Sequence, residues 1–202
     1  MRLARFRGLL LAIAYLQEPA TATDTGPPVH RVAVYLHEDN LVPAAVLARA
    51  RSTASEIFAG IGVQLAWPTR TKRTAAADVH IDIQFDRQPP GGLRTEAFGY
   101  ALPYQPSGIR VHILIDRVLR GAPREHAGFL LGHVIAHEIT HMLEQNDRHS
   151  IEGLMKPQWD ARECLRMASH SLAFDATDAE LVLTSLEKAR EQQQVAMAGA
   201  GR

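Results

Sequence analysis

Two hydrophobic patterns alternate along the chain. Where apolar and polar residues alternate one by one, as they do without interruption over residues 79–85, the pattern predicts a strand with one buried face. The strands predicted in this way are residues 30–37, 63–67 and 79–85, a short edge strand at residues 98–104, and residues 109–118. A loop rich in proline and glycine, residues 88–92, follows the third of these strands.

The sequence predicts four helices, and in the first of them, residues 41–61, apolar residues recur at steps of three and four. Residues 129–144 carry apolar side chains on most sides, which is typical of a buried helix. The last helix is expected to open with Thr177 and Glu180 as a capping box. The predicted helices are residues 41–61, 129–144, 160–169 and 177–193, with a turn at residues 153–157. This order of elements indicates an α+β fold.

The N-terminal residues have the three-part layout of a secretory signal peptide. Three arginines precede the apolar run of residues 9–16, and Ala20-Thr21-Ala22 provides small residues for cleavage after Ala22. Eight apolar residues are too few to cross a membrane, which takes about twenty. We therefore expect residues 1–22 to be a signal peptide and residues 23–202 to be one exported domain, secreted or periplasmic, without a membrane span.

Composition narrows the range of functions. The chain has 202 residues, which suits one domain, and its 22 basic and 22 acidic residues give zero formal charge. Without a basic excess, nucleic acid is not expected as a partner. The single cysteine, Cys164, excludes an internal disulfide framework and any multi-cysteine metal site. Ten histidines are many for this length and direct attention to metal binding or acid–base chemistry.

An H-E-x-x-H motif, defined by His137, Glu138 and His141, lies inside the predicted buried helix. Residues four apart lie about 40° apart around a helix, so both imidazoles can reach one metal ion. Glu138 projects beside the ion, where a carboxylate can take a proton from metal-bound water. The motif predicts one zinc ion per chain, and zinc in a catalytic site needs a third protein ligand.

Three residues are candidates for that third ligand. His149 follows His141 by eight residues, and Asp147 follows it by six. Glu163 lies on the next predicted helix, where a zinc peptidase of the two-helix type would have its third ligand. A chain that stayed helical would carry residue 149 about 12 Å past His141. The helix must therefore break between residues 144 and 148, and Asn146 is the expected site of that break.

The stretch from His137 to His149, together with the following turn that contains Met155, resembles the metzincin clan of zinc metallopeptidases. More particularly, it is similar to a group of exported, uncharacterised bacterial metzincin-like proteins with the longer H-E-x-x-H-x7-H spacing. The resemblance implies a zincin domain with a mixed twisted sheet, a buried zinc-binding helix, a methionine turn and a C-terminal helix. It also implies zinc ligands at His137, His141 and His149, with Met155 as an apolar floor beneath them.

The chain departs from the usual metzincin pattern H-E-x-x-H-x-x-G-x-x-H/D at two positions. Glu144 stands in place of the glycine, and Asp147 stands in the place of the third ligand. The missing glycine implies a later turn, which favours His149, and imidazole is a commoner zinc ligand than a lone aspartate. Asp147 is then expected to cap the turn or to support a ligand imidazole.

The function expected from these residues is that of a zinc metalloendopeptidase. Glu138 is the general base, and the expected partners are a protein or peptide substrate and no second copy of the chain. Two alternatives stay open at this point: a non-catalytic exported zinc-binding domain, and a two-helix zinc peptidase with Glu163 as third ligand. Peptide hydrolysis passes through an oxyanion, which the zinc ion and a second group can stabilise. Tyr100 and Tyr104 are weak candidates for that second group.

The remaining histidines and the cysteine are expected to have no part in the metal site. His133 lies one turn before His137 and is interpreted as a core histidine that has its hydrogen bonds satisfied, in preference to a residue that supports the metal ligands. Cys164 is expected to be a buried thiol. The histidines interpreted as surface or packing residues are His30, His37, His80, His112, His126 and His170.

The signal-peptide interpretation predicts that the exported protein begins at or near Thr23. Intact-mass measurement of the exported protein is expected to show the loss of about 22 residues, because cleavage follows the small residues Ala20 and Ala22. An exported protein that keeps Met1 would contradict this interpretation.

Overall fold

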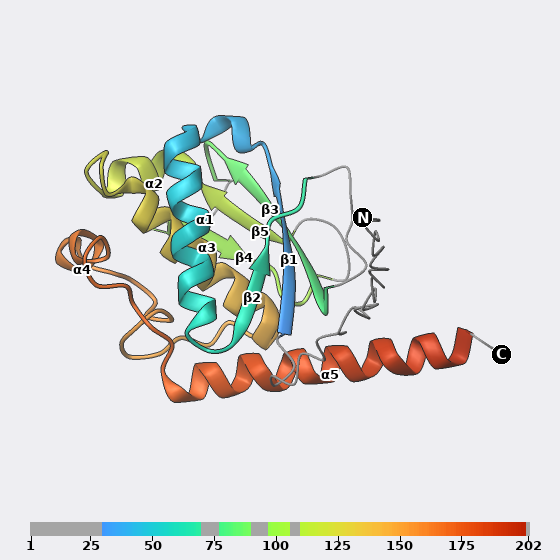
Figure 1. The fold of residues 1–202 in the computed structure, drawn as a ribbon. Helices are drawn as coiled ribbons and strands as arrows, with labels where there is room; N and C mark the ends of the chain where they lie inside the picture. The colour runs from blue at the N-terminus through green and yellow to red at the C-terminus, as the bar shows by residue number, and fades with distance from the viewer. Residues whose placement is uncertain (1–29, 70–76, 90–96, 106–109, 201–202) are drawn as a thin grey trace, which may run out of the picture.

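The computed structural model of the protein describes residues 30–69, 77–89, 97–105 and 110–200. The expected signal peptide and part of the loop at residues 88–92 lie outside these ranges. A five-stranded sheet is packed against helices α1 (Ala44–Ala59) and α3 (Ala127–Glu144), which lie side by side on one of its faces (Figure 1). The sheet and the helices confirm the α+β class.

The sheet is mixed, with the order β2-β1-β3-β5-β4. Its strands are β1 (His30–His37), β2 (Val63–Ala66), β3 (Val79–Asp86), β4 (Gly99–Ala101) and β5 (Val111–Leu114). Neighbouring strands are parallel except β4, which runs antiparallel to β5 at one edge. The expected edge strand at residues 98–104 is therefore confirmed, although it is shorter than the pattern indicated.

β1 lies between two strands and is covered on both faces. Val34 and Leu36 join the main core, on the side of α1 and α3. Ala33 and Tyr35 point to the opposite face and form a small cluster with Ala77. Parallel strands inside a sheet are commonly buried on both sides, which agrees with the apolar residues on both faces of β1.

The helices largely follow the predicted ranges. Besides α1 and α3, they are the 3-10 helix η1 (Asp39–Leu41), α2 (Ile115–Gly121), α4 (Ala161–Arg166) and α5 (Ala176–Ala200). α4 has a complete capping box between Asp160 and Glu163. α5 crosses one end of the sheet and its C-terminal end projects past the other elements (Figure 1). Within the described ranges, no helix combines the length and the apolar character needed to cross a membrane.

The prediction of one strand over residues 109–118 is wrong. The strand ends at Leu114, and α2 begins at the next residue. Ile115 and Val118 are both fully buried, and their spacing of three residues is that of one helical face. A short apolar run fits a buried strand and a buried helix equally well, so periodicity alone did not locate the boundary.

The predicted start of the last helix is also corrected. α5 begins at Ala176, and Asp175 caps it by accepting a hydrogen bond of 2.7 Å from the backbone N–H of Asp178. Thr177 is therefore inside the first turn and not at the cap. Aspartate is a strong N-cap residue, and Asp175 precedes the expected cap by two positions.

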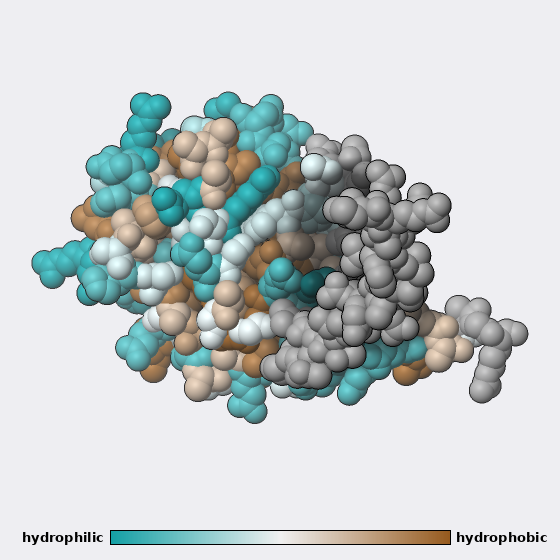
Figure 2. Space-filling model, viewed as in Figure 1, coloured by the Kyte–Doolittle hydropathy of each residue, from teal (hydrophilic) through white to brown (hydrophobic). Residues whose placement is uncertain are grey.

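The outer surface mixes polar and apolar side chains, as the face in Figure 2 shows. Large hydrophobic residues with substantial exposure are spread over several elements. They are Leu102, Tyr104, Ile151, Leu165, Val195 and Met197.

α1 and α3 approach each other closely at two glycines of α3. A Cβ atom at Gly128 would lie 2.7 Å from the Cβ of Arg49. At Gly132 it would lie 2.6 Å from the Cβ of Thr53 and 2.9 Å from the carbonyl oxygen of Ala50. The two glycines are four residues apart and share one helix face, so they set the distance between the two helices.

We predict that Gly132→Ala lowers the free energy of unfolding by about 1–3 kcal/mol, because the added methyl group overpacks the contact with α1. The better helix propensity of alanine, worth about 1 kcal/mol, offsets only part of this cost. Urea unfolding of both proteins measures the difference. Gly199→Ala is the control, because a Cβ there meets nothing within 4 Å. A Gly132→Ala protein as stable as the control would contradict the prediction.

Candidate metal centre

The H-E-x-x-H motif lies on the buried part of α3, as expected. His137, Glu138 and His141 are only 8%, 5% and 6% exposed. α3 is buried along nearly its whole length because it is covered by α1, the sheet and α5. The motif is therefore held by a helix that cannot shift without disturbing the core.

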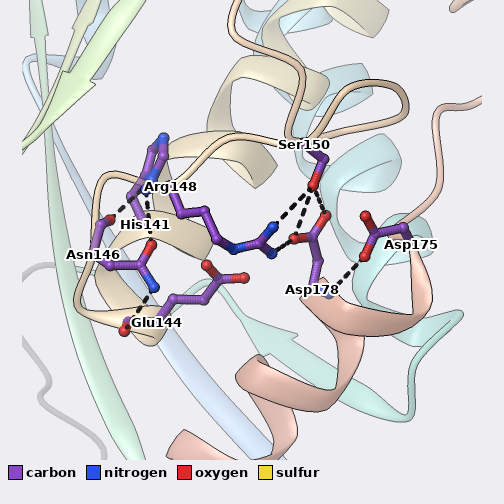
Figure 3. Close-up of polar contacts among 7 residues, drawn as sticks. All are labelled: His141, Glu144, Asn146, Arg148, Ser150, Asp175 and Asp178. Atoms are coloured by element: carbon purple, nitrogen blue, oxygen red, sulfur yellow. Dashed lines mark hydrogen bonds and ion pairs between the residues drawn. The ribbon is translucent and has the colours of Figure 1, made fainter.

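Backbone carbonyl groups fix the orientation of both helix imidazoles. The Nδ1 atom of His137 donates to the carbonyl oxygen of Leu154 at 2.9 Å. The Nδ1 atom of His141 donates to the carbonyl oxygen of Asn146 at 3.1 Å (Figure 3). Since a carbonyl oxygen can only accept, each Nδ1 carries the proton and each Nε2 of a neutral ring presents a lone pair.

The two Nε2 atoms lie 3.1 Å apart. Burial, followed by the neighbouring His141, lowers the pKa of His137 to about 3. Burial, followed by the neighbouring His149, lowers the pKa of His141 to about 4. At neutral pH both rings are therefore uncharged, and no proton lies between the two nitrogens. Two lone pairs that face each other at this distance repel each other, and a cation bound to both nitrogens would remove this repulsion.

His149 completes the cluster. Its ring centroid lies 5.3 Å from that of His137 and 4.8 Å from that of His141. One nitrogen of each of the three rings lies within 4.8 Å of the others, close enough to hold one metal ion. Two nitrogens at about 2.0–2.1 Å from a tetrahedral zinc ion would stand about 3.4 Å apart, so the spacing of the Nε2 atoms of His137 and His141 fits zinc.

The chain reaches His149 by leaving the helix one residue earlier than expected. Gln145, and not Asn146, adopts the left-handed conformation that ends α3, with φ 52°. Asn146 instead stabilises the turn: its carbonyl oxygen accepts from His141, and its side-chain Oδ1 accepts from the backbone N–H of Arg148 at 3.0 Å. The break falls within the range of residues 144–148 that helix geometry required.

The other two candidate ligands lie outside the cluster of three histidines. Asp147 is exposed and lines the same pocket, and its negative charge acts on His141 and His149. Glu163 is bound elsewhere: both of its carboxylate oxygens lie 2.8 Å from Lys156 Nζ, and Oε2 also accepts from the backbone N–H of Asp160. The arrangement thus brings together His137, His141 and His149 and leaves Glu163 in the cap of α4.

Glu138 lies in the same pocket as the three histidines. Burial raises the pKa of its carboxyl group to about 8. Gly99 of β4 provides the space for it, because a Cβ atom there would lie 3.0 Å from Glu138 Oε1 and 2.9 Å from the carbonyl oxygen of His112. The edge strand therefore borders the site directly above the motif glutamate.

The turn that contains Met155 is tied to the motif helix. Gly153 has φ 78°, a left-handed conformation suited to glycine, and opens the turn. Leu154 and Met155 are fully buried, and the carbonyl oxygen of Leu154 is the acceptor for His137. The backbone N–H of Ser150 donates to the carbonyl oxygen of Met155 at 2.8 Å. The turn thus helps to orient one ligand and borders the segment that carries another.

Sequence reasoning missed two residues of the site. Trp159 lines the pocket and packs edge-on against His137, with ring centroids 5.5 Å apart. Gly99 was included in the expected edge strand, but its role beside Glu138 was not recognised. Only the position of Trp159 shortly after the turn was visible in the sequence, and no pattern there indicated a contact with a ligand.

Three further residues, His133, Cys164 and Tyr100, lie near the cluster or on the elements around it. His133 is a satisfied core histidine, as expected: Nδ1 donates to the carbonyl oxygen of Phe129 at 2.8 Å, and Nε2 accepts from the backbone N–H of Leu172 at 3.0 Å. Cys164 is a buried thiol. The weak candidate Tyr100 lines the same pocket as Glu138, and its ring stacks on His112, with ring centroids 4.7 Å apart.

The pocket has a volume of about 840 Å³ and is lined by β4, the motif helix and the residues after the turn. It is large enough for several residues of an extended peptide. No protein-family model and no curated protein matches the chain. The function is therefore inferred from the residues and geometry of this pocket.

We predict that His149→Ala weakens zinc binding about as severely as His141→Ala, because each variant removes one of three imidazoles from the cluster. Asp147→Ala is expected to weaken zinc binding only about 10- to 100-fold, as is typical of a residue that supports a ligand. Competition with a zinc-binding dye measures all three affinities. Loss of zinc from Asp147→Ala, with zinc retained by His149→Ala, would show that Asp147 is the ligand.

The raised pKa of Glu138 predicts a pH-dependent stability of the metal-free protein. Between about pH 4.5 and 8 the unfolded chain releases a proton that the folded chain keeps, so the folded state loses stability as the pH rises. Glu138→Gln removes this titration. We expect the variant to exceed the wild type in stability by on the order of 1–3 kcal/mol at pH 8 and to match it near pH 4.5.

Urea unfolding in the presence of a chelator at both pH values tests this expectation. The lowered pKa values of His137 and His141 affect the wild type and the variant alike, so their contribution cancels from the comparison. A stability difference that is the same at both pH values would mean that Glu138 does not titrate in this range.

Proposed function

We propose that this protein is an exported zinc-dependent endopeptidase of the metzincin type. The observation that carries the proposal is the position of Glu138, a buried carboxyl group in the same pocket as His137, His141 and His149. Structural zinc sites are closed by four protein ligands, whereas catalytic sites have three and leave a position open. Three imidazoles beside an open pocket of about 840 Å³ fit the second kind.

The fold supports the same assignment. The mixed sheet, the buried helix with the H-E-x-x-H motif, the turn with Met155 and the C-terminal helix α5 agree with the layout that the metzincin resemblance implies. The completely buried Met155, next to the residue that orients His137, is consistent with an apolar floor for the metal centre.

In this proposal Glu138 is the group that moves the proton. A zinc ion held by the three histidines would supply a Lewis acid that activates water and polarises the carbonyl group of the peptide. The Glu138 carboxylate accepts the proton of the water and returns it to the leaving amine. Burial raises the pKa of this carboxyl group to about 8 in the metal-free protein. The positive charge of a zinc ion in the same pocket would lower it again and favour the carboxylate form that accepts the proton.

An extended peptide is the substrate that the pocket suits best. β4 is an edge strand, paired with β5 on one side, and Phe98, Gly99 and Ala101 line the pocket. The backbone of an edge strand can pair with an extended peptide and hold it across the site. Such pairing recognises the peptide backbone, so side-chain preference would come from the remainder of the pocket.

Glu138→Gln tests the proposal in the zinc-loaded protein. The amide cannot accept the proton, so we expect the cleavage of a peptide library to fall by at least about 100-fold while one zinc ion stays bound. Glu187→Gln makes the same substitution on an exposed position of α5 and is expected to leave cleavage unchanged.

The outcomes separate the competing functions. A wild-type protein that binds zinc but cleaves no peptide would overturn the proposed activity and favour the non-catalytic zinc-binding domain. Equal cleavage by the wild type and Glu138→Gln would rule out Glu138 as the general base.

A further inference from the structure

The two residues that flank His149 are bound by the same carboxylate. Arg148 Nη2 donates to Asp178 Oδ1, and Ser150 Oγ lies 3.1 and 2.9 Å from Oδ1 and Oδ2 of Asp178 (Figure 3). Asp178 belongs to the first turn of α5, 29 residues along the chain from His149. One side chain of a distant helix therefore holds the segment that presents the third histidine.

Asp178 is a rigid anchor. Its side chain is only 1% exposed, and its backbone N–H donates to the capping residue Asp175. A carboxylate in the first turn of a helix is also stabilised by the helix dipole. Because an ion pair with a buried partner holds its position far better than a pair in water, Arg148 is fixed on one side of His149.

His149 depends on such an anchor more than the other two histidines do. The Nδ1 atoms of His137 and His141 are bound by carbonyl oxygens, whereas no hydrogen bond to another described residue holds the exposed ring of His149. Its orientation is therefore set by the backbone on either side. Ser150, the neighbour bound by Asp178, is also joined to Met155 through its backbone N–H.

We propose that Asp178 is a positioning residue of the metal centre, which holds Arg148 and Ser150 so that the His149 imidazole faces His137 and His141. This inference rests on the proposed metal binding, but not on peptide cleavage. Asp178 itself does not contact the ion. Asp178 holds the His149 segment in place before the metal binds. Less conformational entropy is then lost on binding, and the affinity for the metal is higher.

Asp178→Asn is the direct test, since it keeps the size of the side chain but replaces one acceptor oxygen with a donor. The amide is uncharged and keeps only one acceptor oxygen, so the ion pair with Arg148 is lost and the segment is held less firmly. We expect zinc affinity, measured by competition with a zinc-binding dye, to fall about 10- to 100-fold. Glu144→Gln is the matched control: its charge also acts on Arg148, but it forms no ion pair with it.

The same substitution in a chain that already carries His149→Ala distinguishes positioning of His149 from a general loss of stability. If Asp178 acts through His149, Asp178→Asn should change zinc affinity less than about 3-fold in a chain that already carries His149→Ala. A variant that merely weakens the fold would lose affinity by the same factor in both backgrounds, and this result would overturn the proposal. Unchanged zinc affinity of Asp178→Asn in the chain with His149 would also overturn it.

Failure of this proposal is distinct from failure of the proposed function. A wild-type protein that binds zinc, depends on Asp178 for affinity and cleaves no peptide supports the positioning role and overturns only the peptidase activity. A wild-type protein that binds no zinc overturns both.

Discussion

Two hydrogen bonds from histidine rings to backbone carbonyl groups are the contacts on which the candidate metal centre depends. By accepting from Nδ1 of His137 and His141, the carbonyl oxygens of Leu154 and Asn146 leave both Nε2 lone pairs directed at one point. Both carbonyls belong to the chain after α3. The chain must therefore turn back over its own helix, and the conformation of Gln145 and the turn at Gly153 make that return possible.

The sheet and α1 place the motif helix where this return can occur. Gly128 and Gly132 let α3 lie close against α1, and Gly99 gives Glu138 space beneath the edge strand. Small residues thus set how closely α3 lies to α1 on one side and to β4 on the other. The same packing removes Glu138 from water, so its pKa rises, while the pKa values of His137 and His141 fall. Burial therefore produces neutral imidazoles beside a carboxyl group of raised pKa.

The segment after α3 joins the cluster of three histidines to the C-terminal helix. Asp178 binds both neighbours of His149, and the backbone N–H of Leu154 donates to the carbonyl oxygen of Ala173 just before α5. Two of the three histidines are thereby supported by a part of the chain that contributes no residue to the cluster. Arg190 of α5 also binds Asp78, which directly precedes the internal strand β3, so the support is continuous with the core.

The sequence by itself determined the α+β class, the buried helix and the pair His137 and His141, because these follow from local periodicity and from the geometry of one helix. It also placed the break of α3 within a few residues and indicated His149 as the third histidine of the cluster. Only the tertiary structure decided the end of β5 at Leu114, the cap of α5 at Asp175 and the place of Glu163. Short apolar runs and neighbouring polar residues fit more than one local structure. The contacts of Gly99, Trp159 and Asp178 with the site join residues far apart in the chain, and such contacts arise only when the sheet and helices pack together.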